Sequence, residues 1–130
     1  MNATLILADS ARTHPDGTFS MLRGGITQLN VSPNNPVFFR GTLLVRIVGT
    51  SSESGTHEFK IVCVNEDGAQ VGPDFSGSFE TPPQGGTVQL SIDMQFVFPR
   101  LGHYEFSLSV DRHQLGAWAL DAVTTAVKKE

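Results

Sequence analysis

The segment Gly102–Leu120, GHYEFSLSVDRHQLGAWAL, decides the fold class of this chain. Its first half alternates between large hydrophobic residues at positions 104, 106, 108 and 110 and polar residues at positions 105, 107 and 109. A period of two places the hydrophobic side chains on one face of a strand, whereas a helix would scatter them around its circumference. A turn and a returning strand follow, so we expect a β-hairpin and a chain built largely of β-sheet.

Further strands are predicted along most of the chain. Thr87–Phe98 alternates without a break, and Val37–Val48 is dense in β-branched and aromatic residues, which indicates an inner strand with both faces partly covered. Other patterns predict strands at residues 3–8, 19–22, 26–31, 58–64, 76–80 and 114–120. The last of these strands can extend as far as residue 127. The strands at 3–8 and 76–80 are expected at sheet edges. No segment shows the 3.6-residue period of a helix.

Residues that favour turns separate these strands. Arg12–Gly17 is expected to turn the chain, Arg23–Gly25 to form a bulge or bend, and Ser32–Pro36 and Thr81–Gly86 to form loops. Eight or nine short strands with turns between them predict a single domain, residues 1–130. The expected fold is all-β, a two-sheet antiparallel β-sandwich of immunoglobulin-like or jelly-roll-like type.

Composition and charge exclude several classes of protein. The chain has 130 residues, 39% of them hydrophobic and 17% charged, which is ordinary for a globular domain. Its net charge of -4 and pI near 5.5 argue against a general nucleic-acid or anionic-membrane surface, since such binding needs clustered Lys and Arg. The apolar run at the N-terminus is too short for a signal sequence or a membrane span. We expect a cytoplasmic protein that binds neither nucleic acid nor membrane.

Cys63 is the single cysteine, so no intramolecular disulfide and no cysteine-rich metal site can form. It lies in an apolar strand, and we expect it to be buried.

No pattern of catalytic or cofactor-binding residues is present. The four histidines lack a metal-binding spacing, although His14 with Asp16 and His113 with Asp111 can meet at loop ends. There is no nucleophile elbow and no phosphate-binding loop. Asp93 and Glu105 are expected on neighbouring strands, exposed to solvent. We therefore predict no cofactor, no metal and no enzymatic activity; a histidine clustered with a carboxylate in a pocket would favour an enzyme instead.

Five residues are candidates for contact with a partner or ligand: Phe38, Phe39, Arg112, His113 and Trp118. Phe38 and Phe39 are adjacent in a strand and must point to opposite faces, so either both faces are covered or one ring is exposed. Trp118 is expected to pack over the hairpin. Arg112 and His113 lie in an exposed turn.

Three stretches, Leu5–Ala11, Asp16–Gly25 and Gly102–Asp111, resemble an uncharacterised bacterial family of small β-sandwich proteins, a domain of unknown function with the pattern ADSA…DGxxS…GxYxFxLxVD. The resemblance supports the fold and implies no substrate, cofactor or catalytic residue. Two departures stand out: Leu101–Gly102 replaces the usual Pro-Gly, and Asp111–Arg112 replaces the usual Asp-Gly. Because Arg adopts a positive φ less readily than Gly, a longer turn from Asp111 to Gln114 is expected.

The leading hypothesis is a non-catalytic interaction or structural module of unknown role, which acts through sheet edges or end loops and binds a protein partner or a second copy. The alternative is a β-sandwich that binds a small ligand or a carbohydrate through loop aromatics. That alternative requires an exposed aromatic ring beside polar groups in a concave site.

Overall fold

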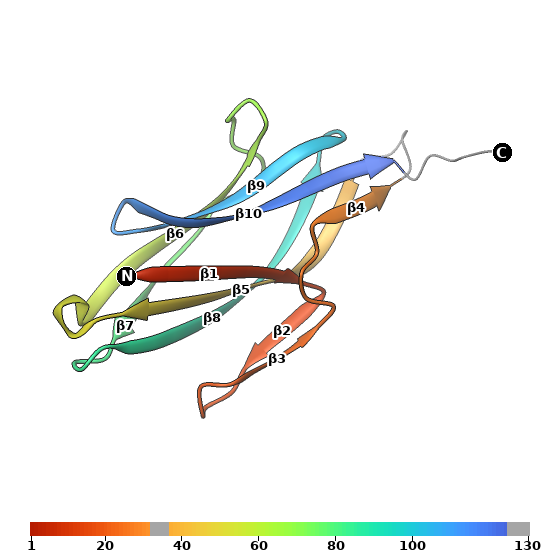
Figure 1. Cartoon of the computed structure of the whole chain (residues 1–130). Coiled ribbons are helices and arrows are strands. Elements are labelled where there is room, and N and C mark those ends of the chain that lie inside the picture. Colours follow the sequence, from red (N-terminus) through yellow and green to blue (C-terminus); the bar gives the residue numbers. More distant parts are fainter. Residues whose placement is uncertain (32–36, 125–130) are drawn as a thin grey trace.

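The computed structural model describes residues 1–31 and 37–124, which form ten strands and one short 3-10 turn, η1 (Figure 1). The predicted loop Ser32–Pro36 and the predicted extension to residue 127 lie outside the described residues. The elements are β1 (Asn2–Ala8), β2 (Ser10–Thr13), β3 (Phe19–Leu22), β4 (Gln28–Val31), β5 (Val37–Gly49), η1 (Ser51–Glu53), β6 (Gly55–Asn65), β7 (Phe75–Thr81), β8 (Gly86–Phe98), β9 (Gly102–Val110) and β10 (His113–Thr124).

The strands form three sheets, so the protein is all-β with more strands and sheets than expected. One sheet has the order β1-β5-β8, a second has the order β4-β10-β9-β6-β7, and β2 and β3 form a separate hairpin. All pairs are antiparallel except β4–β10, which is parallel. The expectation of two purely antiparallel sheets was therefore wrong in the number of sheets and in the direction of the β4–β10 pair.

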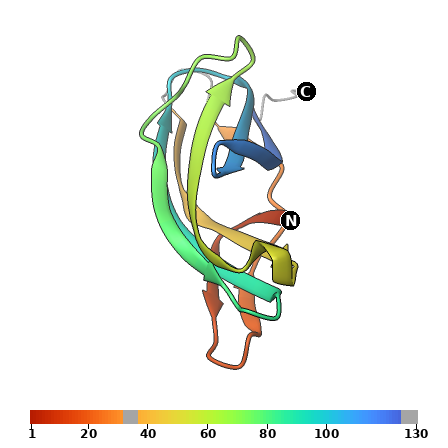
Figure 2. The ribbon, with the colours of Figure 1, turned by 90° about the vertical axis from the view of Figure 1, so that its left-hand side faces the viewer.

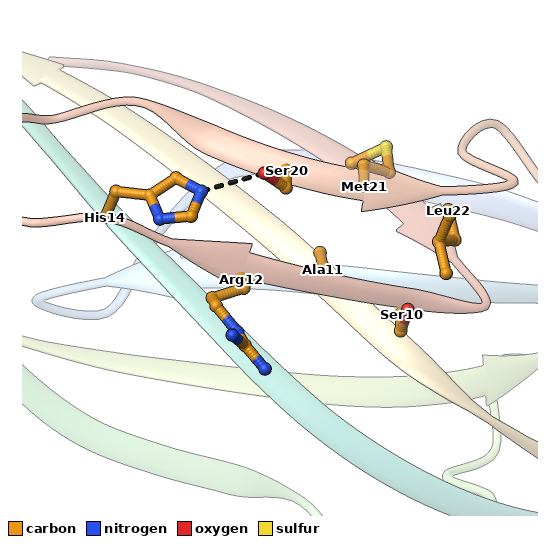
Figure 3. A pocket seen from close by; sticks show the side chains of 7 residues that line it. All are labelled: Ser10, Ala11, Arg12, His14, Ser20, Met21 and Leu22. Atoms are coloured by element: carbon orange, nitrogen blue, oxygen red, sulfur yellow. Dashed lines mark hydrogen bonds between the residues drawn. The ribbon is translucent and has the colours of Figure 1, made fainter.

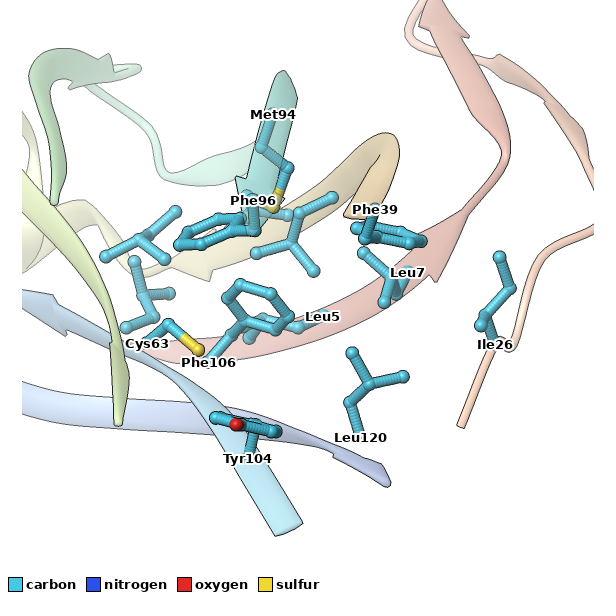
Figure 4. Packing of buried hydrophobic residues seen from close by; sticks show 14 of the residues in the cluster. Leu5, Leu7, Ile26, Phe39, Cys63, Met94, Phe96, Tyr104, Phe106 and Leu120 are labelled. Carbon is cyan, nitrogen blue, oxygen red and sulfur yellow. The ribbon is translucent and has the colours of Figure 1, made fainter. Parts of the chain in front are cut away.

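The three-stranded and five-stranded sheets face each other, and the hydrophobic core lies between them (Figures 1 and 4). Aromatic rings from both sheets meet there: Phe98 and Tyr104 have ring centroids 4.5 Å apart, and Phe96 and Phe106 5.4 Å. The Tyr104 hydroxyl donates a hydrogen bond to the Arg100 carbonyl oxygen at 2.6 Å. A buried phenol thus keeps a polar partner, which removes the cost of burying an unpaired hydroxyl.

The hairpin β9–β10 confirms the alternation that decides the fold class. The hydrophobic residues of β9 are all buried in the core, and the residues between them are half-buried or exposed on the opposite face. β10 returns antiparallel along β9, with Leu120 paired to Tyr104 and also buried. Leu115 is an extra residue in β10, where the register shifts between Gln114 and Gly116.

The β2–β3 hairpin lies across the outer face of the three-stranded sheet and projects away from the two facing sheets (Figures 2 and 3). Near its tip, the Gln89 side-chain amide of β8 donates a hydrogen bond to the Gly17 carbonyl oxygen. Leu44 and Thr42 of β5 point outward from the core, yet they are only 2% and 3% exposed. We attribute their burial to this hairpin, which explains why β5 is covered on both faces.

The outer face of the five-stranded sheet has no such cover in the described residues, and its side chains are mostly small or polar. The outward residues of β7, β9 and β10 include Ser76, Ser78, Glu80, His103, Glu105, Ser107, Ser109, Gln114, Ala117, Ala119 and Asp121, and β6 contributes Glu58, Lys60, Val62 and Val64.

Cys63 is fully buried in the core, as expected, and burial raises the pKa of its thiol to about 12. A thiol with this pKa remains protonated and is a poor nucleophile. Among the described residues, no helix is long and apolar enough to cross a membrane.

Candidate functional site

His57 in β6 joins two segments that are distant from each other in the sequence. Its Nδ1 lies 2.6 Å from Oδ2 of Asp111, and its Nε2 lies 2.6 Å from the backbone oxygen of Glu53. Because both partners are acceptors, these bonds are both made only when each ring nitrogen carries a hydrogen. The hydrogen bond to Asp111, followed by that to Glu53, raises the pKa of His57 above 6.5. The arrangement therefore favours an imidazolium that donates from both nitrogens.

Two carboxylates complete this cluster. The Asp111 carboxylate accepts a second hydrogen bond from the Glu58 backbone N–H at 3.0 Å, and the bond to His57 lowers the pKa of Asp111. The Glu53 carboxylate lies 2.8 Å from the amino group of Met1, which lowers the pKa of Glu53 to about 2. The cluster links η1, β6 and the β9–β10 turn through charged groups of opposite sign.

The cluster borders a groove of about 230 Å³, which Met1, Glu53, His57, Asp111 and His113 help to line. A histidine with a carboxylate in a pocket is the arrangement that would favour an enzyme, and catalysis would require His57 to accept or donate a proton. With both nitrogens donating, His57 has no lone pair left to accept a proton as a general base. The bonds suit a structural connection better than a catalytic one.

The β9–β10 turn is a two-residue turn, and the prediction of a longer turn was wrong. Asp111 and Arg112 have φ values of 50° and 72°, so both adopt the left-handed conformation that glycine favours. His113 already belongs to β10. The two bonds to the Asp111 carboxylate and the bond from the Asp111 N–H to the Glu58 oxygen, at 2.8 Å, fix this conformation. Tertiary contacts thus compensate for the absence of glycine.

Arg112 and His113 are exposed, as expected for a turn. Arg112 borders a groove of about 590 Å³ on the side of the five-stranded sheet, together with Lys60, Ser76 and Ser109. His113 lies on the other side of the turn, where its Nδ1 is 3.1 Å from the Asp111 backbone oxygen. The groove beside Arg112 is therefore lined by two cationic side chains, Lys60 and Arg112, and by the two carboxylates of Glu58 and Asp111.

The three aromatic candidates do not form one site. Phe38 is 66% exposed and Phe39 only 5%, which confirms that they point to opposite faces. Phe38 pairs with Val97 of β8, which is also exposed. Trp118 is half-buried, and its indole N–H donates to the Ile26 carbonyl oxygen at 2.7 Å. Phe38 is the one member of the three whose ring is freely available to a partner.

Other polar pairs offer little support for an active site. His103 and Asp121 form a bond of 2.7 Å, but both side chains are about half exposed on the open sheet face. Asp93 and Glu105 are in different sheets, so the expectation of neighbouring strands was wrong. His14 bonds to Ser20 at 2.8 Å beside a groove of about 280 Å³ on the β2–β3 hairpin (Figure 3). No group of three potential metal ligands occurs among the described residues.

The free edge of β7 is the remaining candidate. Within residues 1–31 and 37–124, β7 pairs with β6 alone, and it approaches β8 without forming a ladder with it. Its sequence, FSGSFET, contains no proline and no lysine, and Glu80 is its only charged residue. Its outward side chains are exposed. Natural sheets usually protect an edge with proline, lysine or a bulge, so β7 is an unprotected edge.

The other sheet edges are shorter than β7, or they lie against other elements more extensively than β7 lies against β8. β4 has four residues, β1 packs beside β10, and β8 is contacted by the β2–β3 hairpin. The prediction that residues 76–80 and 3–8 form edge strands is confirmed, and the structure distinguishes them by their surroundings.

Comparison with known proteins identifies a family whose function is unknown. A model of a family of unknown function, DUF6941, matches residues 3–123. The chain belongs to this family. No curated protein and no solved structure matches the chain. The resemblance to a family of unknown function is thus confirmed, while the bacterial origin and the short sequence pattern remain predictions.

Proposed function

We propose that this protein is a non-catalytic interaction module that binds an extended segment of a protein partner along β7. The free, unprotected edge of β7 is the observation that carries the proposal. An edge strand presents unpaired N–H and C=O groups, and a bound segment adds one strand through main-chain hydrogen bonds. Among the described residues, β7 has no backbone hydrogen bond to any element except β6.

The sheet beside this edge suits an added strand. Ser76, Gly77 and Ser78 are exposed and small, so a second backbone can approach without a side-chain clash. Lys60 pairs with Ser76 of β7 and favours an acidic residue opposite Ser76 in the bound segment, whereas Arg112 shares its groove with the carboxylates of Glu58 and Asp111. We also assign the two facing sheets to the β-sandwich class, in which binding often uses edges and end loops.

The non-catalytic part of the proposal is supported by the contacts of the histidines. His57 is engaged at both nitrogens, and the His103–Asp121 pair lies on an open face. A ligand-binding site built on loop aromatics has less support, because Phe39 is buried and the indole N–H of Trp118 is already bonded. The cytoplasmic location remains a prediction.

Selection from a library of random linear peptides, displayed on phage and bound to the immobilised protein, tests the proposal. We expect extended peptides with alternating side chains and acidic residues, and slower hydrogen exchange of the β7 amides in their presence. A Phe38→Ser protein is the matched control and is expected to bind the same peptides. Peptides that protect another surface, or the absence of any enriched peptide, would contradict the proposal.

A further inference from the structure

We infer that the partner of β7 is a second copy of this chain, whose β7 pairs antiparallel with the first about a two-fold axis at Ser78. The inference rests on the proposed function and names the partner for the same edge. Two-fold dimers are the commonest soluble homo-oligomers, and in them each copy contributes the same surface. The edge must therefore be complementary to itself.

The length and sequence of β7 meet this condition. Ser78 is the central residue of the seven in β7, so an axis there pairs the whole strand without an overhang. Ser76 then lies opposite Glu80 of the second copy, and Ser78 lies opposite Ser78. An axis at Glu80 would instead place two carboxylates opposite each other, which is unfavourable. The axis at Ser78 thus combines full pairing with the absence of like charges.

Charge complementarity favours the same register. Lys60 pairs with Ser76 within one copy, so Lys60, Ser76 and the second copy's Glu80 follow one another across three adjacent strands. Adjacent strands are about 4.8 Å apart, which puts the backbones of Lys60 and that Glu80 roughly 10 Å apart with a small serine between them. Their long side chains can meet over this serine, and symmetry repeats the contact.

Lys60 is available for this contact. Its present partner, Asp74, lies 3.4 Å from its Nζ, and both side chains are about half exposed. An exposed pair of this kind contributes little stability, so Lys60 can turn to Glu80 at small cost. Arg112 borders the same groove, but there it is accompanied by the carboxylates of Glu58 and Asp111, so the complementary charge for Glu80 comes from Lys60.

The interface formed by one strand pair is small, so we expect a weak dimer that depends on concentration. Sedimentation velocity and light scattering on the full chain, from about 5 to 500 µM, measure it directly. Ser78→Lys places two lysines opposite each other at the axis, while within one copy the new lysine faces Glu58 and the fold is retained. We expect the dimer to weaken at least tenfold.

Ser91→Lys is the matched control, because Ser91 is an exposed serine on the outer face of the other sheet. It is expected to leave the dimer unchanged. Circular dichroism and urea unfolding establish that both variants are folded.

A charge-exchange experiment tests the register independently. Lys60→Glu and Glu80→Lys are each expected to weaken self-association about tenfold, since each creates two repulsive pairs per dimer. An equimolar mixture of the two variants restores attraction at both pairs and is expected to dimerise at least as well as the unmodified chain. The double variant, K60E with E80K, is also expected to recover. A mixture that stays monomeric would overturn this register.

The outcomes separate this inference from the proposed function. A monomer throughout the concentration range overturns self-pairing, as does a dimer that Ser78→Lys leaves unchanged. If the chain is monomeric but selected peptides still slow hydrogen exchange in β7, the proposed function stands with a different partner. If neither a dimer nor such a peptide is found, both proposals fail.

Discussion

The outer faces of the two facing sheets differ in how they meet solvent. The three-stranded sheet is partly covered by the β2–β3 hairpin, and the five large hydrophobic residues that are exposed in the described part of the chain belong to this sheet or the hairpin: Phe19, Leu22, Phe38, Val48 and Val97. The outer face of the five-stranded sheet has no cover in the described residues and carries mostly small or polar side chains, and the charged cluster around His57 holds one end of the sheet. Burial beneath the hairpin therefore stabilises the outer face of the three-stranded sheet, whereas the outer face of the five-stranded sheet is exposed to solvent.

Truncation of outward residues should reveal this difference most strongly. Leu44→Ala removes a large side chain from beneath the hairpin, where a cavity would remain, and is expected to lower the free energy of unfolding by about 2–5 kcal/mol. Val62→Ala changes an outward, half-buried residue of the uncovered sheet and should cost less than about 1.5 kcal/mol. Urea unfolding measures both. Equal costs would mean that the hairpin does not bury Leu44.

Removal of the β2–β3 hairpin also tests whether it buries Leu44, and it does so without creating a cavity. The Asp9 N–H bonds to the Leu22 oxygen at 3.1 Å, so the two ends of the hairpin are close and residues 10–22 can be replaced by Asn-Gly. Exposure of Leu44 alone should cost about 1.5–3 kcal/mol. Binding of a hydrophobic dye should increase. Unchanged stability and dye binding would show that the hairpin is not a cover.

The stability of the five-stranded sheet should depend on pH through His57. Its pKa is raised in the folded protein, so the contribution of the imidazolium is fully present below 6.5, the ordinary value, and is lost as the pH rises through the folded pKa. The midpoint of urea unfolding should therefore decrease as the pH rises from about 6 to 9. In His57→Gln this decrease should become smaller; an identical pH profile would exclude His57 as its source.

A second, opposite dependence is expected in acid. The pKa values of Asp111 and Glu53 are lowered in the folded protein, so their contributions are present above the ordinary values and are lost as the pH falls through the folded values. Asp111→Asn should reduce the dependence of stability on acidic pH. Leu44→Ala should leave the dependence on acidic pH unchanged, since Leu44 is uncharged and lies beneath the hairpin, away from the cluster.

The smallest effect is expected for the exposed apolar pair. Changing Phe38 and Val97 together to Ser should alter the free energy of unfolding by no more than about 1 kcal/mol, because both side chains are already exposed. Solubility at high concentration should improve, as measured by light scattering after ammonium sulfate addition. A large loss of stability would show that this pair is covered in solution.

The fold class and most strands follow from local patterns in the sequence, whereas the sites depend on distant contacts. The alternation in β9 and β8 is long enough to identify their inner faces. β2 was missed because Ser10–Thr13 is mostly polar and acquires order from its position across β5 and β8. The turn at Arg112 was predicted to be longer because its conformation depends on contacts of Asp111 with His57 and Glu58.

The surface properties were predicted only in part for the same reason. The opposite orientation of Phe38 and Phe39 follows from strand geometry, but which of the two rings is buried depends on how the sheets pack. The His57–Asp111 contact joins residues 54 positions apart, and no local sequence pattern predicts it. The nearest sequence signal is Arg112, a residue other than glycine that directly follows Asp111 in the turn.

The pairing of β4 with β10 has a consequence for synthesis of the chain. The Trp118 indole donates to the Ile26 backbone oxygen across 92 positions, and the neighbouring parallel ladder joins residues 28–31 to residues 121–124. Such distant contacts slow folding, because a long loop must close before they form. During translation, β4 emerges long before β10 exists. The strands that precede β10 must therefore remain unaggregated until β10 has been synthesised.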